Sequence, residues 1–366
     1  MDISKVIIKM NKKSKLQFLL VAILSTLSLL SSCQIRAEPP PACAGENLWG
    51  SPPIAVDWLG YVPQLVWLNN GKQILFQTDR QSLYVADLEK SVRSIVTFRQ
   101  YSEVEVYDIS GLANSTTIFH TQLHDDNSAY IVAIDIATQS EIQLTEGKDP
   151  LPSPDGRQLA FVRKDGLYVM KMENGTTNLV AEDYFRGLSW HPDSTKLAYY
   201  GDSFEDKVHI LDLGSGENRT ITDNDYCEWY PAWSADGEML AYVATYEDNL
   251  DIFAIEEPND TPVNLTRSDL NEYQFAWHPK QKQMAIVVRQ EGKVSINQRQ
   301  MDIYLLDVET GSLKQLTQTP NIHESFPRWS PQGDWLAFIA LDGGKWYVEV
   351  LDMESSEHFR VAEPTR

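Results

Sequence analysis

The chain has few basic residues for its size, and this shortage excludes one large class of partners. Its 366 residues include 31 Lys and Arg against 52 Asp and Glu, which gives a formal net charge of −21. So acidic a protein repels the phosphate backbone of nucleic acids and anionic lipid head groups. We therefore expect no nucleic-acid partner, and we expect membrane attachment to depend on a lipid rather than on basic side chains.

Signatures of catalysis are missing as well. The sequence has no Gly-x-Ser-x-Gly, the turn that carries the nucleophile of many hydrolases. It also has no His-Glu-x-x-His and no pair of cysteines at zinc-binding spacing. We predict no catalytic residue, no metal site and no cofactor, and the question of enzymatic activity stays open.

Long apolar runs are scarce, and the one sustained run lies near the N-terminus. Residues 18–30 are apolar but too few to cross a bilayer, and five lysines precede them. A basic segment, a short apolar core and small residues before a cleavage point are typical of a secretory signal. The following Leu30-Ser31-Ser32-Cys33 resembles the bacterial lipobox, whose cysteine is lipidated. We predict a signal peptide over residues 1–32 and a lipid on Cys33, the alternative being an ordinary signal peptide with a coincidental cysteine.

Cysteine is rare too, with three in the whole chain. Residues 33–47 form the predicted lipidated tether, in which three consecutive prolines favour an extended polyproline-type chain. An exported protein meets an oxidising compartment, so Cys43 and Cys227 are predicted to form a disulfide. Two unpaired or intermolecular thiols are the alternative.

The clearest positive signal is a repeated segment. Trp-Ser-Ala-Asp-Gly at residues 233–237 recurs as Trp-Ser-Pro-Gln-Gly at 329–333, and weaker copies lie upstream. Each copy is followed by an alternating apolar run and a polar hairpin, and four of the repeats end in a Leu-Thr or Ile-Thr pair. Taking the Trp position as the marker, the copies fall at residues 67, 109, 152, 190, 233, 277 and 329. A period of about 43 residues is typical of one four-stranded propeller blade.

A single blade cannot bury both faces of its sheet, whereas blades stacked around an axis can. We therefore predict an all-β fold, a β-propeller over residues 48–366, preceded by the lipoprotein signal peptide. Seven four-stranded blades are expected, with six or eight as alternatives. The segment His120 to Asp126 resembles a set of metal ligands when taken alone, but the repeat places it in a solvated hairpin turn.

This repeat resembles the WSPDG-type repeat of TolB-like β-propellers, which also occurs in the propeller domains of prolyl oligopeptidase and dipeptidyl peptidase relatives. The resemblance covers about residues 62–362. It implies the fold and leaves the function open, because such propellers serve as enzymes, gates and binding platforms. TolB has an α/β domain ahead of a six-bladed propeller, and we expect that domain to be missing here.

Three glutamates occupy the same place in successive repeats. Glu228, Glu272 and Glu324 each lie five residues before a marker Trp, in the loop that leads into the innermost strand. We call these segments lead-in loops, and the face of the ring that carries them the lead-in face. The repeat predicts that the carboxylates line an arc of the channel mouth, where they attract a cation or an amine. The alternative is structural, with each glutamate accepting backbone N–H bonds from the adjacent loop.

Several other residues complete the predicted binding site on the lead-in face. Arg186 is the available internal partner for the glutamates. The remaining members flank them in the lead-in loops: Trp229, Tyr273, His323 and Phe326. Some similar seven-bladed propellers, the oligogalacturonate lyases, hold a metal through clustered histidines in the channel. Only His323 lies at a comparable position here, so a metal site of that kind lacks its ligands and none is predicted.

A second candidate is a hairpin in the sixth repeat that is about seven residues longer than its counterpart in the fifth. Arg289, Lys293 and Arg299 make this hairpin basic on an acidic protein. Long loops are often functional, although added length in a surface hairpin costs little free energy and can arise by neutral drift.

Together these features predict an exported, membrane-anchored propeller lipoprotein of the bacterial cell envelope. It is expected to act as a non-catalytic scaffold that binds an envelope protein or peptide through the lead-in face. Gln34 after Cys33 implies, by resemblance to Gram-negative lipoproteins, the periplasmic face of the outer membrane. The alternative is a propeller enzyme or sensor for a saccharide or peptide in the channel.

Overall fold

The computed structural model describes most of the chain between residues 64 and 362. The segments outside the described residues are 1–63, 69–70, 78–79, 89–93, 113, 183–184, 202–206, 223, 225, 247–248, 258, 290–299 and 363–366. The predicted signal peptide, tether, Cys33, Cys43, Lys293 and Arg299 therefore lie outside the described residues. Within the described part, no helix is long and apolar enough to cross a membrane.

The described elements are 28 β-strands, and consecutive strands pair antiparallel in groups of four. We number these four-stranded units 1 to 7 in chain order. Unit 1 contains β1 (Gln64–Leu68), β2 (Gln73–Gln77), β3 (Ser82–Asp87) and β4 (Ser94–Gln100). Unit 2 contains β5 (Glu105–Gly111), β6 (Thr117–Leu123), β7 (Ala129–Asp135) and β8 (Glu141–Glu146). Unit 3 contains β9 (Lys148–Pro152), β10 (Gln158–Arg163), β11 (Gly166–Lys171) and β12 (Thr177–Ala181).

The later units repeat the same order. Unit 4 contains β13 (Phe185–Trp190), β14 (Lys196–Gly201), β15 (Val208–Asp212) and β16 (Asn218–Thr220). Unit 5 contains β17 (Glu228–Trp233), β18 (Met239–Tyr246), β19 (Asn249–Glu256) and β20 (Asn259–Asn264). Unit 6 contains β21 (Asn271–Trp277), β22 (Gln283–Arg289), β23 (Met301–Asp307) and β24 (Leu313–Gln315). Unit 7 contains β25 (Ile322–Trp329), β26 (Trp335–Asp342), β27 (Lys345–Asp352) and β28 (His358–Ala362).

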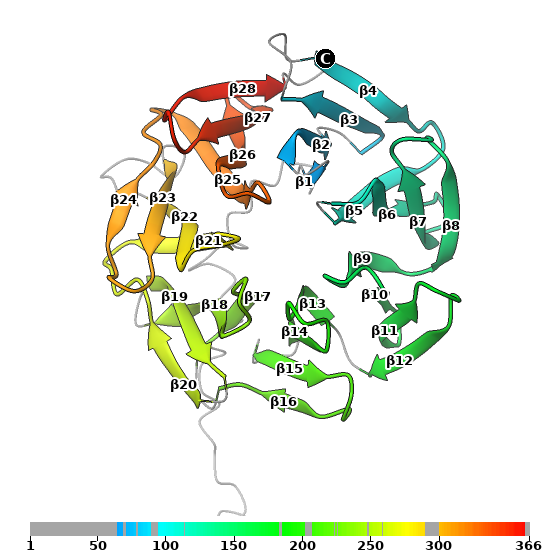
Figure 1. The fold of residues 1–366 in the computed structure, drawn as a ribbon, viewed down its shortest axis with the longest axis horizontal. Helices are drawn as coiled ribbons and strands as arrows, with labels where there is room; N and C mark the ends of the chain where they lie inside the picture. Colours follow the sequence, from blue (N-terminus) through cyan, green and yellow to red (C-terminus); the bar gives the residue numbers. More distant parts are fainter. Residues whose placement is uncertain are drawn as a thin grey trace, which may run out of the picture. The chain divides into compact units, whose positions relative to one another are not determined.

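The strands form six sheets, consistent with a propeller. Five sheets have four strands, and the sixth has eight because units 6 and 7 are joined by one parallel pairing, Met301 with His323. Figure 1 shows that the first strand of each unit lies nearest the centre and the fourth lies at the rim. Because the strands alternate in direction, the lead-in loops and the hairpins between second and third strands share one face. The turns between first and second strands lie on the other, which we call the turn face.

Apolar clusters fill the spaces between neighbouring units. One cluster lies between each consecutive pair of units along the chain. A further cluster joins the two ends of the series, with Trp67 and Phe76 of unit 1 packed among Trp346 and Val348 of unit 7. The ring is therefore closed by packing of the same kind at the first and last units as elsewhere.

The marker Trp recurs in the repeat because it packs between neighbouring units. Its indole is buried between units, since Trp233 is 6 % exposed and Trp329 9 %. Four marker indoles donate a hydrogen bond to a backbone carbonyl of the preceding unit, as Trp329 does to Ala276 O at 3.0 Å. In unit 2 the strand register places Gly111 opposite Ile118, in the slot of Trp233 opposite Leu240. The unit-2 marker is therefore two residues beyond the position 109 expected from sequence.

The Ser-x-Asp-Gly that follows the marker builds the turn between the first and second strands. Ser234 Oγ accepts a hydrogen bond from Met239 N at 2.9 Å, and Asp236 accepts one from Glu238 N at 3.0 Å. Gly237 has φ of 77°, and a Cβ there would lie 2.5 Å from the ring of His191 in the preceding unit. Glycine is needed because both the backbone angle and the close approach exclude a side chain.

Candidate functional site in the central channel

The three repeated glutamates lie between units and not on the open channel wall. Glu228, Glu272 and Glu324 are each 0 % exposed. The Glu228 carboxylate accepts hydrogen bonds from Thr222 Oγ1 at 2.6 Å and from Val208 N at 3.2 Å. Burial of the three carboxylates differs from the expected arc at the channel mouth. It agrees with the alternative in which each glutamate accepts hydrogen bonds from adjacent loops and strands. A role of these glutamates in binding a partner stays a prediction.

Glu272 and Glu324 also accept hydrogen bonds from hydroxyl groups at the next two interfaces, and the pKa of each is raised. Ser268 Oγ donates to Glu272 at 2.6 Å, and Thr319 Oγ1 donates to Glu324 at 2.6 Å. Burial, reinforced by the neighbouring Asp251 carboxyl, raises the pKa of Glu272 to about 8. Burial also raises the pKa of Glu324 to about 7. At neutral pH these two side chains therefore carry a proton for much of the time, which makes them weak ligands for a cation.

The predicted aromatic and basic members of the site are divided between two places. Arg186 and Phe326 line a cavity in the channel. Tyr273 is instead buried and accepts a hydrogen bond from Arg289 Nη1 at 2.7 Å. Trp229 packs against the clusters on both sides of unit 5. His323 is half-buried in β25, and burial lowers its pKa.

The cavity runs along the innermost strands toward the turn face and has a volume of about 710 Å³. Counting back from the marker residue of each unit, we define position −1 as the residue just before it and position −3 as the third before it. Both positions face the cavity in most units. At position −1 the lining residues are Val66, Ser110, Leu151, Ala276 and Arg328. At position −3 they are Gln64, Asp108, Asp149, Gly187 and Phe326.

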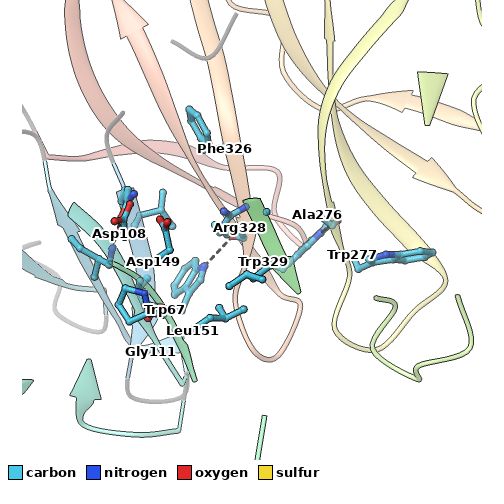
Figure 2. Close-up of a pocket in the computed structure, with 18 of the residues that line it drawn as sticks. Trp67, Asp108, Gly111, Asp149, Leu151, Ala276, Trp277, Phe326, Arg328 and Trp329 are labelled. Atoms are coloured by element: carbon cyan, nitrogen blue, oxygen red, sulfur yellow. Dashed lines mark hydrogen bonds between the residues drawn. The ribbon is translucent and has the colours of Figure 1, made fainter. Parts of the chain in front are cut away.

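Asp108 and Asp149 form an acidic pair on one side of this cavity (Figure 2). Both residues have positive φ, 52° and 55°, because β5 and β9 each bulge at position −3. Burial is the main cause that raises the pKa of Asp149 to about 7, followed by the charge of Asp108 and a hydrogen bond between the two side chains. Lys148 and Arg186 act in the opposite direction but do not outweigh these effects.

Arg328 comes from unit 7 and lines the same cavity (Figure 2). Its backbone carbonyl accepts the Trp67 indole bond at 2.9 Å, and its Nη1 donates to Pro327 O at 3.1 Å. Water reaches the side chain inside the channel, yet protein surrounds it closely enough that burial lowers the pKa of the guanidinium. No carboxylate among the described residues forms an ion pair with it.

Three residues of this cavity, Asp108, Asp149 and Arg328, were not predicted from the sequence. The signal that could have found them is the repeat itself, because position −1 is uncharged in every unit except unit 7. Position −3 is likewise uncharged in every unit except 2 and 3. Structural roles such as that of the marker Trp recur from unit to unit, whereas these charges do not.

The predictions for Cys227 and for His120 have different outcomes. Cys227 is fully buried and disulfide-bonded. Its partner lies outside the described residues, so pairing with Cys43 stays a prediction. His120 was expected in a solvated turn, which is wrong: it is buried in β6, where its Nε2 lies 3.3 Å from Tyr101 Oη. The turn holds only the later part of that segment, and the described residues contain no group of three His, Cys, Asp or Glu that could hold a metal.

Comparison with known proteins supports the fold. Residues 187–357 match the family model described as the TolB beta propeller domain. The uncharacterized peptidase YuxL of Bacillus subtilis is 26% identical over 206 residues, which are 52% of this chain and 29% of that protein. The chain therefore spans less than a third of the length of this relative.

Solved structures give the same picture. The structure of TolB from Acinetobacter baumannii has a TM-score of 0.50 and 15% identity, covering 82% of this chain and 78% of that one. A puromycin hydrolase structure has a TM-score of 0.65 and 13% identity, covering 86% and 56%. At these identities the likeness shows the fold alone. The described residues begin at β1, so the expected absence of an α/β domain ahead of the propeller stays a prediction. The predicted resemblance to TolB-like β-propellers is confirmed, because residues 187–357 match the TolB beta propeller domain.

Proposed function

We propose that this chain is an exported, lipid-anchored, seven-bladed propeller of the bacterial envelope that binds another protein and catalyses no reaction itself. The seven blades are units 1 to 7. The anchor rests on the lipobox-like Leu30-Ser31-Ser32-Cys33, and the envelope location rests on the signal that precedes it. Similar propellers occur in proteins named as peptidases. The proposal is therefore tested below against a role in an enzymatic activity.

The observation that carries the non-catalytic part of the proposal is the chemistry of the channel. Ser110 and Ser330 are the only hydroxyl side chains among the residues that line the described cavity. Ser110 Oγ donates to Pro150 O, and Ser330 Oγ donates to Asp334. Ser110 is thus held by a backbone carbonyl and Ser330 by the Asp334 carboxylate of its own turn, and no His or Lys lines the described cavity to activate either hydroxyl. A charged, accessible cavity without an activated nucleophile favours binding over covalent catalysis.

Photo-crosslinking in intact cells tests the proposal. A photoreactive amino acid is placed on the lead-in face at Asp269 or Asn321, both exposed. Matched controls carry it in exposed turns between third and fourth strands, at Glu173 or Glu354, which lie on the opposite face. We expect both lead-in positions to capture the same envelope protein and both control positions to capture none. Equal capture from the two faces, or none from either, would exclude binding through the lead-in face.

A second candidate function is a channel enzyme acting on a saccharide or peptide. It is favoured by one observation, the pKa of Asp149 near 7 beside Asp108, which is the arrangement of an acid and a base in many hydrolytic sites. Asp149→Asn would leave the crosslinking pattern unchanged under the binding proposal. Under the enzyme proposal it would abolish turnover of a substrate found by screening saccharides and peptides.

A further inference from the structure

The charge of Arg328 has no structural explanation in the described part of the chain. Its counterparts at position −1 are uncharged, so the repeat does not require a guanidinium there. The inter-unit bond with Trp67 uses the backbone carbonyl of Arg328 and leaves the side chain uninvolved. Among the described residues, the side chain donates only to the neighbouring carbonyl of Pro327.

The surroundings of Arg328 select the kind of anion that would pair with it. Apolar side chains line the cavity beside it, among them Trp67, Leu151 and Phe326 (Figure 2). Asp108 and Asp149 face the same space, and the whole protein is strongly acidic. A phosphate dianion would be repelled more strongly than a singly charged carboxylate. The planar guanidinium also matches a carboxylate in bidentate geometry.

We infer that the channel binds an apolar ligand that ends in a carboxylate, with Arg328 as the residue that holds the carboxylate. The cavity of about 710 Å³ is large enough for a ligand of drug size or for the end of a peptide. The acidic pair opposite acts as a filter against a second negative charge. This inference goes beyond the proposed function, because a protein could bind the lead-in face while the channel held no ligand.

Two pairs of probes test the inference on the full chain by isothermal titration calorimetry. The first pair is 3-phenylpropionate and its amide. The second pair is N-acetyl-Ala-Ala-Phe with a free C-terminus and the same peptide as its C-terminal amide. We expect the acid of at least one pair to bind about 10-fold or more tightly than its amide, the amount supplied by a charge-assisted hydrogen bond. The pair with the larger ratio distinguishes a small acid from a peptide terminus.

Variants locate the site. Arg328→Gln should remove the preference for the acid, and Arg328→Lys should retain part of it, because the charge stays but the planar fork is lost. Arg157→Gln is the matched control, since its side chain is 85% exposed and pairs only weakly with Asp155. The melting temperature of Arg328→Gln should equal that of the wild type, because Trp67 bonds to the backbone. Asp149→Asn should bring the affinity for phenyl phosphate closer to that for 3-phenylpropionate.

The comparison in the wild-type protein does not depend on any variant. Equal affinity for acid and amide in both pairs, or no measurable binding of either acid, would overturn the inference. An acid preference that survives Arg328→Gln would overturn the assignment to Arg328. Failure here would leave the crosslinking result on the lead-in face untouched, so the two proposals fail separately.

Discussion

Replacing Glu272 by Gln should make the free energy of unfolding depend less on pH. Glu272 is fully buried, and its pKa in the folded protein is about 8 against an ordinary value of 4.5. Between those two values the folded protein binds a proton that the unfolded chain has lost. The contribution of Glu272 to stability is therefore largest below about pH 5 and falls as the pH rises toward 8. Glu272→Gln keeps the neutral form at every pH and removes this loss.

The magnitude follows from the size of the shift. One pKa unit corresponds to about 1.4 kcal/mol, so a shift from 4.5 to about 8 sets an upper limit of roughly 5 kcal/mol. Local relaxation around the Asp251 carboxyl and entry of water will reduce the measured effect, and we expect about 1–3 kcal/mol between about pH 5 and about pH 8. Ser268, which donates to Glu272, can equally donate to the amide oxygen of Gln.

Urea unfolding followed by far-UV circular dichroism at several pH values measures this dependence. Glu228→Gln is the contrasting variant, because the Glu228 carboxylate accepts hydrogen bonds from Val208 N and Asn224 Nδ2. An amide nitrogen in place of one carboxylate oxygen would face a donor, so Glu228→Gln should destabilise the protein by about 1–3 kcal/mol near neutral pH. If Glu272→Gln and the wild type lost stability in parallel with rising pH, the buried proton would not reside on Glu272.

Two further predictions concern the packing and the anchor. Trp233→Ala should lower the free energy of unfolding by about 3–5 kcal/mol, because a buried large aromatic is truncated at the interface of units 4 and 5; a loss below about 1 kcal/mol in urea unfolding would contradict that packing. Cys33→Ala should accumulate as a precursor that keeps its signal peptide and lacks acyl chains, as measured by mass spectrometry of membrane fractions. A Cys33→Ala protein of wild-type mature mass would show that cleavage does not depend on a lipobox.

The sequence predicted the repeating architecture because its structural residues recur. The marker Trp, the Ser-x-Asp-Gly turn and the Leu-Thr pair each appear several times at a constant spacing. The structure also brings together the Leu-Thr pair and the repeated glutamate, which are separate signals in the sequence. The hydroxyl of Thr222, from one Ile-Thr pair, donates to Glu228 of the next unit. Thr317 donates to Glu324 in the same way. Repetition of the glutamate therefore indicated an inter-unit contact.

The candidate site was harder to predict for the same physical reason. Repetition directs attention to positions that every unit shares, and it favoured the glutamates over residues that occur once. Asp108, Asp149 and Arg328 are ordinary charged residues along the chain and become neighbours of one cavity only when the ring closes. The expectation for His120 failed because β6 continues to Leu123, so the hairpin turn begins four residues later than expected.

The bond that four marker indoles make to a backbone carbonyl has a consequence for how such a channel can change over evolution. Because the acceptor belongs to the main chain at position −1, the side chain at that position takes no part in holding the units together. Substitutions there can alter the chemistry of the channel wall while the inter-unit bonds persist. The residues that stabilise the ring are therefore different from those that determine which ligand the channel binds. Ligand preference can evolve by single substitutions at position −1 with little loss of stability.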